Sequence, residues 1–166
     1  MVYKDEPVKA KIKILTQQEY SQGAGQISME GTVYTVQLNP SSINITDGVH
    51  YDKKSTVFKE LEGRRAPLSQ YTTHNARELS VQLLFDTYTS ELSETEKKDV
   101  KKEYIDEFLK LIANKEGKPP LVFFSWGSIQ FKGVVTKMNY TYTMFTREGK
   151  PVRASMNLTL TEYFFE

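Results

Sequence analysis

A long pair of strand-like segments near the C-terminal end constrains the fold of this chain more than any other feature. Residues 129–145 read as one strand, the turn-forming sequence Arg-Glu-Gly-Lys-Pro follows at 147–151, and an alternating strand returns. Fully extended, the first strand would span about 55 Å at about 3.3 Å per residue, whereas an ordinary strand spans about 17–20 Å. This hairpin, at about 129–163, must either bend to serve two sheets of one domain or reach beyond the domain to another subunit.

The returning strand predicts one apolar and one polar face, because its residues alternate with a period of two. The apolar members are Val152, Ala154, Met156, Leu158 and Leu160, and the polar members are Arg153, Ser155, Asn157, Thr159 and Thr161. The apolar face needs a cover, and an uncovered strand edge invites pairing with a neighbouring chain. Gly133 predicts a bulge or bend in the first strand. Geometry alone leaves the bend and the subunit contact equally open.

The rest of the chain predicts a single, mainly β domain over residues 1–166. Further strands are expected at 8–14, 32–38, 43–46, 77–85 and 121–125, and one helix at about 94–114 behind a capping box at Ser93–Glu96. Strands and helices do not alternate, which argues against a parallel sheet. An antiparallel β-barrel or sandwich with one flanking helix is therefore expected.

Residues 48–76 show neither a strand period nor a helix period. Structureless segments of this length are uncommon in compact domains and usually functional. We therefore expect a long contact loop here that becomes ordered on assembly.

The composition predicts no catalytic residue, metal site or cofactor. The chain has no cysteine, and its two histidines, His50 and His74, lack further ligands at metal-binding spacing. Neither a nucleophile elbow nor a phosphate-binding glycine fingerprint is present. No apolar run reaches membrane-spanning length, and the N-terminus does not resemble a secretory signal, so we expect a protein made and kept in the cytoplasm.

A monomeric small β-barrel that binds a ligand or single-stranded nucleic acid is the alternative. Tyr140, Tyr142 and Phe145 are suited to stacking on bases. The net charge is only +1, however, so the positive field that usually accompanies nucleic-acid binding is missing.

Several short motifs, in order over about residues 33–163, resemble the tube proteins of contractile injection systems and phage tails. They are Val36-Gln-Leu-Asn-Pro-Ser-Ser42, Leu79-Ser-Val-Gln-Leu-Leu-Phe-Asp-Thr-Tyr88, Pro119-Pro-Leu-Val-Phe-Phe-Ser-Trp-Gly127, Phe131-Lys-Gly-Val-Val135, Met144-Phe145 and Gly149-Lys-Pro-Val-Arg-Ala154. Each motif is weak alone, and the ordered set is fairly specific. The resemblance implies the phage tail-tube type of β fold.

The resemblance also implies a structural subunit that forms a ring, sixfold in the family, at the junction of tube and baseplate. Its partners would be copies of itself and neighbouring tube and baseplate hub proteins, with DNA or an effector passing through the lumen. Relatives often carry a LysM module after this domain, which this sequence lacks. The protein would assemble in the cytoplasm of a bacterial host and then reside in the virion or tail-like particle.

Ten residues within these motifs are the structural and interface candidates. They are Asn39, Pro40, Trp126, Gly127, Phe131, Gly133, Phe145, Gly149, Pro151 and Arg153. We expect Trp126 to anchor the core, the glycines to allow bends, and Pro151 to fix the turn. Arg153 is expected to pair with an acid across the sheet or across a subunit boundary.

Overall fold

The structure, a computed structural model, describes residues 7–53, 69–88, 98–113 and 117–164. Its main element is a seven-stranded antiparallel sheet. The order is β2 (Val33–Thr35), β1 (Lys11–Leu15), β7 (Leu121–Trp126), β8 (Ile129–Phe145), β9 (Pro151–Thr161), β6 (Glu78–Asp86) and β3 (Ile43–Thr46). The prediction of a mainly β, antiparallel fold with one flanking helix is confirmed. The sheet folds over as a sandwich does and does not close into a barrel.

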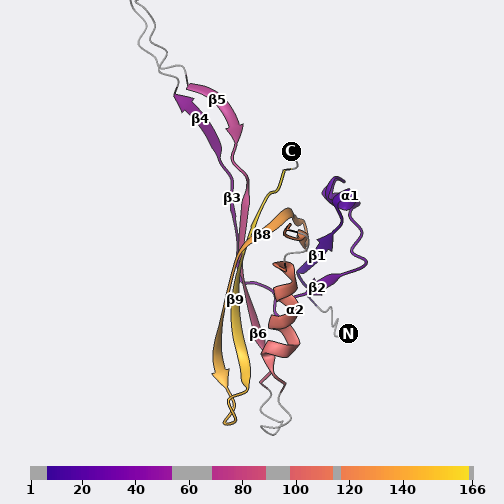
Figure 1. The fold of residues 1–166 in the computed structure, drawn as a ribbon, viewed down its shortest axis with the longest axis vertical. Coiled ribbons are helices and arrows are strands. Elements are labelled where there is room, and N and C mark those ends of the chain that lie inside the picture. Colours follow the sequence, from indigo (N-terminus) through magenta and orange to yellow (C-terminus); the bar gives the residue numbers. More distant parts are fainter. Residues whose placement is uncertain (1–6, 54–68, 89–97, 114–116, 165–166) are drawn as a thin grey trace, which may run out of the picture.

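The long strand β8 changes partner along its length. Residues 129–134 pair with β7 and residues 134–145 pair with β9, so that Val134 lies opposite both Leu121 and Thr161. The register shifts between Val135 and Lys137, as at a β-bulge. Figure 1 shows β8 curving from the β8–β9 hairpin towards β1 and β2. The bend that Gly133 predicts is therefore present, and it connects the two halves of the sheet.

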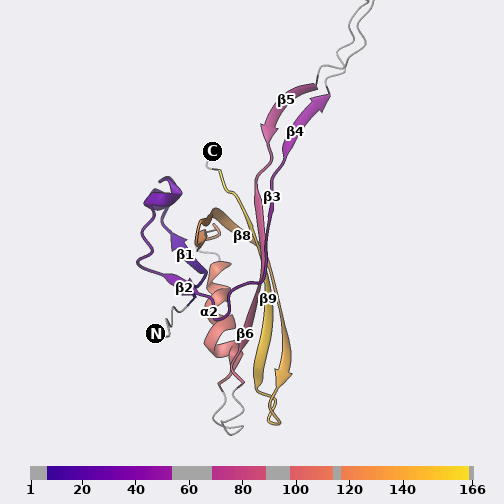
Figure 2. The same ribbon diagram turned by 180° about the vertical axis from the view of Figure 1, so that it is seen from behind.

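One face of β6 and β9 forms the core against the helix. The helix is continuous over a π-helical turn η2 (Lys101–Ile105), α2 (Asp106–Phe108) and a 3-10 turn η3 (Leu109–Leu111). Phe85 of β6 stacks on Tyr104, with ring centroids 5.0 Å apart, and also contacts Phe108 at 5.1 Å. Figures 1 and 2 place the helix and β1–β2 on the same side of the long strands. The opposite face of those strands has no covering element among the described residues.

The sequence predicts a loop over residues 48–76, but part of this segment forms two strands. Strands β4 (Val49–Lys53) and β5 (Ser69–His74) pair as a two-stranded ribbon that continues β3 and β6 away from the body (Figure 1). Their sequences contain valine, tyrosine and threonine, which favour strands, but lack the apolar alternation of a strand packed on a core. Residues 54–68, in the same predicted loop, lie outside the described part of the chain.

The helix is shorter in the described residues than the predicted range of 94–114. Ser93–Glu96, the predicted capping box, lies outside the described residues. At the other end the helix stops at Leu111, and Ile112, which lies within the predicted range, is 41% exposed. A second short helix, α1 (Gln17–Tyr20), and a 3-10 turn, η1 (Ala24–Gln26), lie between β1 and β2.

Helix α1 is fixed to β1 by a buried lysine. Lys13 is only 4% exposed, and its Nζ donates to Oε1 of Glu19 at 2.6 Å and to the carbonyl oxygen of Ser28 at 2.7 Å. Glu19 also accepts from the backbone N–H of Thr16, at the start of the helix. The hydrogen bond from Lys13, followed by that from Thr16, lowers the pKa of Glu19 from 4.5 to about 2.

The Glu19→Gln substitution should flatten the loss of stability in acid. A carboxylate with a lowered pKa stabilises the folded state above the unfolded pKa of 4.5, and this contribution disappears as the pH falls towards about 2. The variant should be less stable than the wild type at pH 7, and the difference should shrink between pH 4.5 and pH 2. Urea unfolding over that pH range measures this; parallel curves for both proteins would contradict it.

Candidate self-assembly interface

The part of the sheet formed by β3, β6, β9 and β8 has two open edges. Beyond Val134, β8 pairs only with β9, and no other described strand lies on its far side. On the opposite side, β6 is the only described strand that pairs with β3. Open edges present unpaired backbone N–H and C=O groups, which favour pairing with another chain.

The β8 edge carries a cluster of aromatic side chains. The rings of Tyr140 and Tyr142 lie 5.9 Å apart, and those of Tyr142 and Phe145 lie 6.5 Å apart. Phe145 is 55% exposed and Tyr140 is 39% exposed. Burial raises the pKa of Tyr142, so its hydroxyl is neutral at physiological pH. This edge therefore offers an uncharged aromatic surface beside unpaired backbone.

The opposite edge carries exposed aliphatic side chains. Ile45 of β3 is 39% exposed, Val49 at the start of β4 is 41% exposed, and Ile43 is half-buried. The two edges differ in their side chains. Because they lie on opposite sides of one open sheet, their unpaired backbone groups cannot form hydrogen bonds with one another within one chain.

The uncovered face of this four-stranded sheet is polar and nearly balanced in charge. Neighbouring side chains across the strands are mostly hydroxyls and amides, and Asn157 Nδ2 donates to Asn139 Oδ1 at 2.9 Å. Arg153 Nε donates to Oδ2 of Asp86 at 2.9 Å, and Nη2 of Arg153 forms an ion pair with the same oxygen at 2.9 Å. The expected acidic partner of Arg153 is thus on the neighbouring strand of the same chain. Such a face can be wetted by water without attracting either sign of charge strongly.

Four of the candidate residues shape the bends and turns. Gly127 (φ 59°) lies in the two-residue connection between β7 and β8, and Gly149 (φ 83°) lies in the turn before β9. Both have the positive φ that glycine adopts most readily. Pro151 begins β9 opposite Phe145, and Gly133 lies where β8 changes partner.

Two more candidates, Asn39 and Trp126, hold the segment before β1. Asn39 Oδ1 accepts from the N–H of Ala10 at 3.0 Å, and its Nδ2 donates to the carbonyl of Val8 at 2.9 Å. Trp126 Nε1 donates to the same carbonyl at 3.0 Å. Pro40, the residue after Asn39, is buried. Trp126 is half-buried and packs against the core from its margin.

The remaining candidates are Phe131, Phe145 and Arg153. Phe131 is buried, and the guanidinium of Arg77 lies 5.9 Å from its ring centroid. Among the ten candidates, only Phe145 belongs to the aromatic cluster on the β8 edge, so an interface role for the others stays a prediction. Ile43 and Ile45 were not among the candidates, because nothing in the sequence of a short strand such as β3 indicates that the strand lies at the edge of a sheet.

The Trp126→Phe substitution should cost about 1 kcal/mol of unfolding free energy. Phenylalanine keeps the aromatic contact but loses the hydrogen bond to the Val8 carbonyl, and a typical bond of this kind contributes about 1 kcal/mol. Asn39→Ala removes two hydrogen bonds to the same segment and should cost more. Urea unfolding of both variants measures the order, and a larger loss in Trp126→Phe would contradict it.

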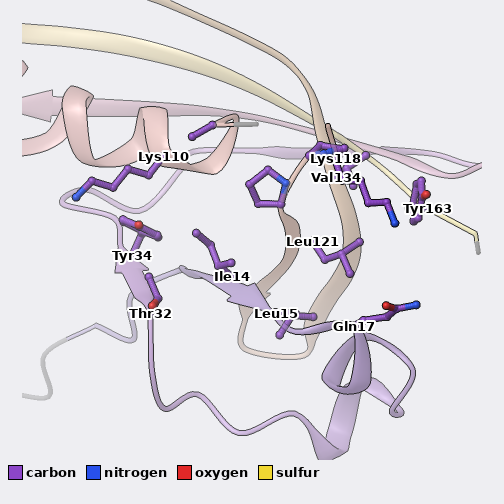
Figure 3. A pocket seen from close by; sticks show the side chains of 13 residues that line it. Ile14, Leu15, Gln17, Thr32, Tyr34, Lys110, Lys118, Leu121, Val134 and Tyr163 are labelled. Atoms are coloured by element: carbon purple, nitrogen blue, oxygen red, sulfur yellow. The ribbon is translucent and has the colours of Figure 1, made fainter. Parts of the chain in front are cut away.

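A pocket of about 720 Å³ lies on the other side of the molecule from the uncovered face. Figure 3 shows Ile14 and Leu121 in its middle, Lys110 towards one end, and Lys118 and Tyr163 towards the other. Its lining is mainly apolar and comes from β1, β2, the end of the helix and the start of β7. Pockets of this size hold small ligands in many proteins.

Metal-site and membrane signals are both missing from the described residues. No group of three or more histidine, aspartate or glutamate side chains gathers there as a metal site would require. None of the helices in this part of the chain is both long and apolar enough to pass through a membrane.

Comparison with known proteins gives one family. No curated protein matches the chain. The sequence model of the family described as contractile injection system tube protein matches residues 6–165, which is nearly the whole chain. This range includes both open edges, the uncovered polar face and the hairpin. The chain therefore belongs to the contractile injection system tube protein family.

Proposed function

We propose that this protein is a structural subunit that forms a ring, sixfold in symmetry, at the junction between tube and baseplate of a contractile phage tail or tail-like injection particle. The observation that carries the proposal is the pair of unlike open edges, β8 and β3, on opposite sides of one sheet. Contacts between unlike surfaces of identical subunits generate closed rings or open filaments.

The uncovered face supports a lumen through which cargo passes. In a ring joined at these edges, the helix and β1–β2 occupy one side of the sheet, and the polar face occupies the other. The described side chains on that face are mainly uncharged, and Arg153 and Asp86 neutralise one another. DNA or an effector protein would therefore pass without specific binding. The proposal assigns no catalysis to the chain.

The ribbon of β4 and β5 supports contacts along the tube axis. It extends from one end of the molecule, and the β8–β9 hairpin forms the opposite end (Figure 1). Neighbouring rings and baseplate hub proteins are the partners that we propose for these two ends.

Light scattering and negative-stain microscopy of the purified chain test the proposal. Rings with a central hole and six subunits are the expected particles. Stacks that stop after one or a few rings would support an adaptor at the baseplate junction, whereas long tubes would support the main tube. A strictly monomeric protein at high concentration would contradict the ring.

The pocket favours one alternative, a monomeric module that binds a ligand. Its volume and mainly apolar lining suit a small molecule, with Lys110 and Lys118 at its margin. Salt-dependent binding of an oligonucleotide, or of a small ligand that shifts the melting temperature of a monomer, would support this reading over the ring.

A further inference from the structure

The short strand β2, at one end of the seven-stranded sheet, has a third open edge. It pairs with β1 on one side, and no described strand lies on its other side. Figure 2 shows β2 beside α2, on the side of the long strands away from the polar face. This edge is distinct from the other two, because β3 lies at the opposite end of the sheet order and β1 and β7 separate β2 from β8.

The hydrogen bonds between β1 and β2 determine which backbone groups face this edge. Ile14 N–H donates to the Thr32 carbonyl at 3.1 Å, and Val36 N–H donates to the Ala10 carbonyl at 3.1 Å. Since direction alternates along a strand, the even-numbered residues here face β1. The odd-numbered residues of β2 therefore direct their N–H and C=O groups outwards.

Val33 and Thr35 are the two residues of β2 whose backbone is open. Between them, Tyr34 packs its ring on Phe108 of the helix, with centroids 5.8 Å apart. Residues that lie side by side on neighbouring strands carry their side chains on the same face. In a strand added at this edge, the residue beside Tyr34 would therefore direct its side chain towards the helix.

A groove of about 440 Å³ receives side chains on that face. Residues 31–35 form one wall, and the helix forms the other with Glu103, Tyr104, Glu107, Phe108 and Lys110. The groove thus combines aromatic rings with charged groups. An added strand would lie along its β2 wall.

The helix wall of the groove has an excess of negative charge. Lys110 Nζ donates to both carboxylate oxygens of Glu107, at 3.0 and 2.9 Å, so these two charges offset one another. Glu103 is exposed, and no described residue forms an ion pair with its carboxylate. A lysine or arginine beside Tyr34 can lay its apolar stem along the aromatic ring and direct its charge to Glu103.

The other open edges of this chain do not supply such a residue. On the helix-covered face, β8 presents Met138, Tyr140 and Tyr142, and β3 presents Ile43 and Ile45. None of these side chains is charged. The chemistry of the groove therefore favours a segment of a different protein over an edge strand of a second copy.

We propose that an extended segment of a partner protein adds to the open edge of β2 as an antiparallel strand and places a lysine or arginine beside Tyr34, where it pairs with Glu103. Antiparallel addition continues the sheet, in which all described pairs are antiparallel. Backbone hydrogen bonds hold the segment, and the groove selects its side chain. Because β2 has only three residues, the basic side chain decides between segments. This contact is separate from the proposed ring, since it uses neither the β8 edge nor the β3 edge.

A fluorescent peptide with blocked ends, Thr-Val-Thr-Lys-Thr-Val-Thr, tests this contact by anisotropy with the full chain. Its residues favour a strand, and its lysine is central. The control peptide has glutamate in place of lysine. We expect the lysine peptide to bind and the glutamate peptide to bind about five-fold more weakly or worse, because an exposed ion pair is replaced by repulsion.

A charge exchange locates the binding site. Glu103→Lys should weaken binding of the lysine peptide about five-fold or more and strengthen binding of the glutamate peptide. Glu148→Lys makes the same change at an exposed position in the turn before β9 and should alter neither affinity. Circular dichroism establishes that both variants fold.

Backbone N-methylation of the lysine peptide tests the strand pairing. Methyl groups on the two threonines that flank the lysine remove the N–H groups that face β2, so binding should be lost. Methyl groups on the two valines lie on the far edge of the added strand, so binding should remain.

Several results would overturn the contact. They are equal or reversed effects of the two methylations, equal affinity for the lysine and glutamate peptides, and no binding of the lysine peptide up to about 1 mM. Binding to monomers but not to assembled rings would assign the groove to a neighbouring copy and so overturn the partner segment. The lysine preference together with its reversal in Glu103→Lys would support the contact, whether or not the chain forms rings.

Discussion

Gly133→Ala is expected to lower the free energy of unfolding by about 3 kcal/mol, at the upper end of what overpacking of a well-packed site usually costs. A Cβ atom at this position would lie 2.2 Å from the carbonyl oxygen of Thr161 and 2.7 Å from its carbonyl carbon. Both are backbone atoms of β9, which cannot turn aside as a flexible side chain can. Relief therefore requires the two strands to separate where β8 changes from β7 to β9.

Gly25→Ala is the matched control for this substitution. No atom lies within 4 Å of a Cβ at Gly25, and we expect a change within about 0.5 kcal/mol. Urea unfolding of both variants gives the comparison, and circular dichroism shows whether Gly133→Ala still folds. Equal stabilities would mean that β9 does not approach Gly133 as closely as the structure has it, and that the bend does not depend on glycine.

The sequence predicts strands best where one face is buried. The predicted range 77–85 matches β6 within one residue at each end, and alternation in residues 152–160 identifies the core face of β9. Burial on one side of a strand produces this period, so the pattern reports packing directly. Strands β4 and β5 lack the period, and their pairing depends on the continuation of β3 and β6.

Sheet order could not be read from these patterns. Strand β1, early in the chain, pairs with β7, and β3 pairs with β6, because strand pairing depends on the whole fold. The short helix α1 did have a sequence signal, since Thr16 and Glu19 form a capping box. That signal was missed because the helix is a single turn within a region rich in glycine and serine.

The candidate interface was only partly visible in the sequence. Tyr140, Tyr142 and Phe145 stand out as aromatics in a strand, but base stacking explains such a pattern as well as subunit contact does. An edge is defined by a missing partner, and this becomes apparent only when the pairing of β7 with β8 is seen to stop at Val134. Most motif residues proved to shape turns and local packing, as Gly127, Gly149 and Asn39 illustrate.

Tyr140→Lys is expected to abolish assembly and to leave the monomer folded. Tyr140 is 39% exposed on the edge strand, so its replacement leaves no large cavity in the core. A lysine at the edge places a hydrated charge where the proposed subunit contact would bury an aromatic ring, and natural edge strands carry lysines that prevent pairing in this way. A closed ring repeats the same contact between all neighbouring subunits, so the loss applies at every contact. Light scattering should change from rings to monomers.

Ile112→Lys is the control, because it removes an apolar side chain of similar exposure, 41%, and adds the same charge at the end of the helix. It should assemble as the wild type does. A proline pair separates the proposed contact at the β8 edge from the fold. Thr141 lies opposite Ser155, whose backbone groups face β8 because those of Val152 and Glu162 face β6. Thr141→Pro therefore removes an N–H that bonds to β9, whereas Tyr140→Pro removes one that faces the open edge. Tyr140→Pro should therefore yield folded monomers and Thr141→Pro a destabilised chain. Rings formed by Tyr140→Lys and Tyr140→Pro as readily as by the wild type would place the subunit contact elsewhere than on β8.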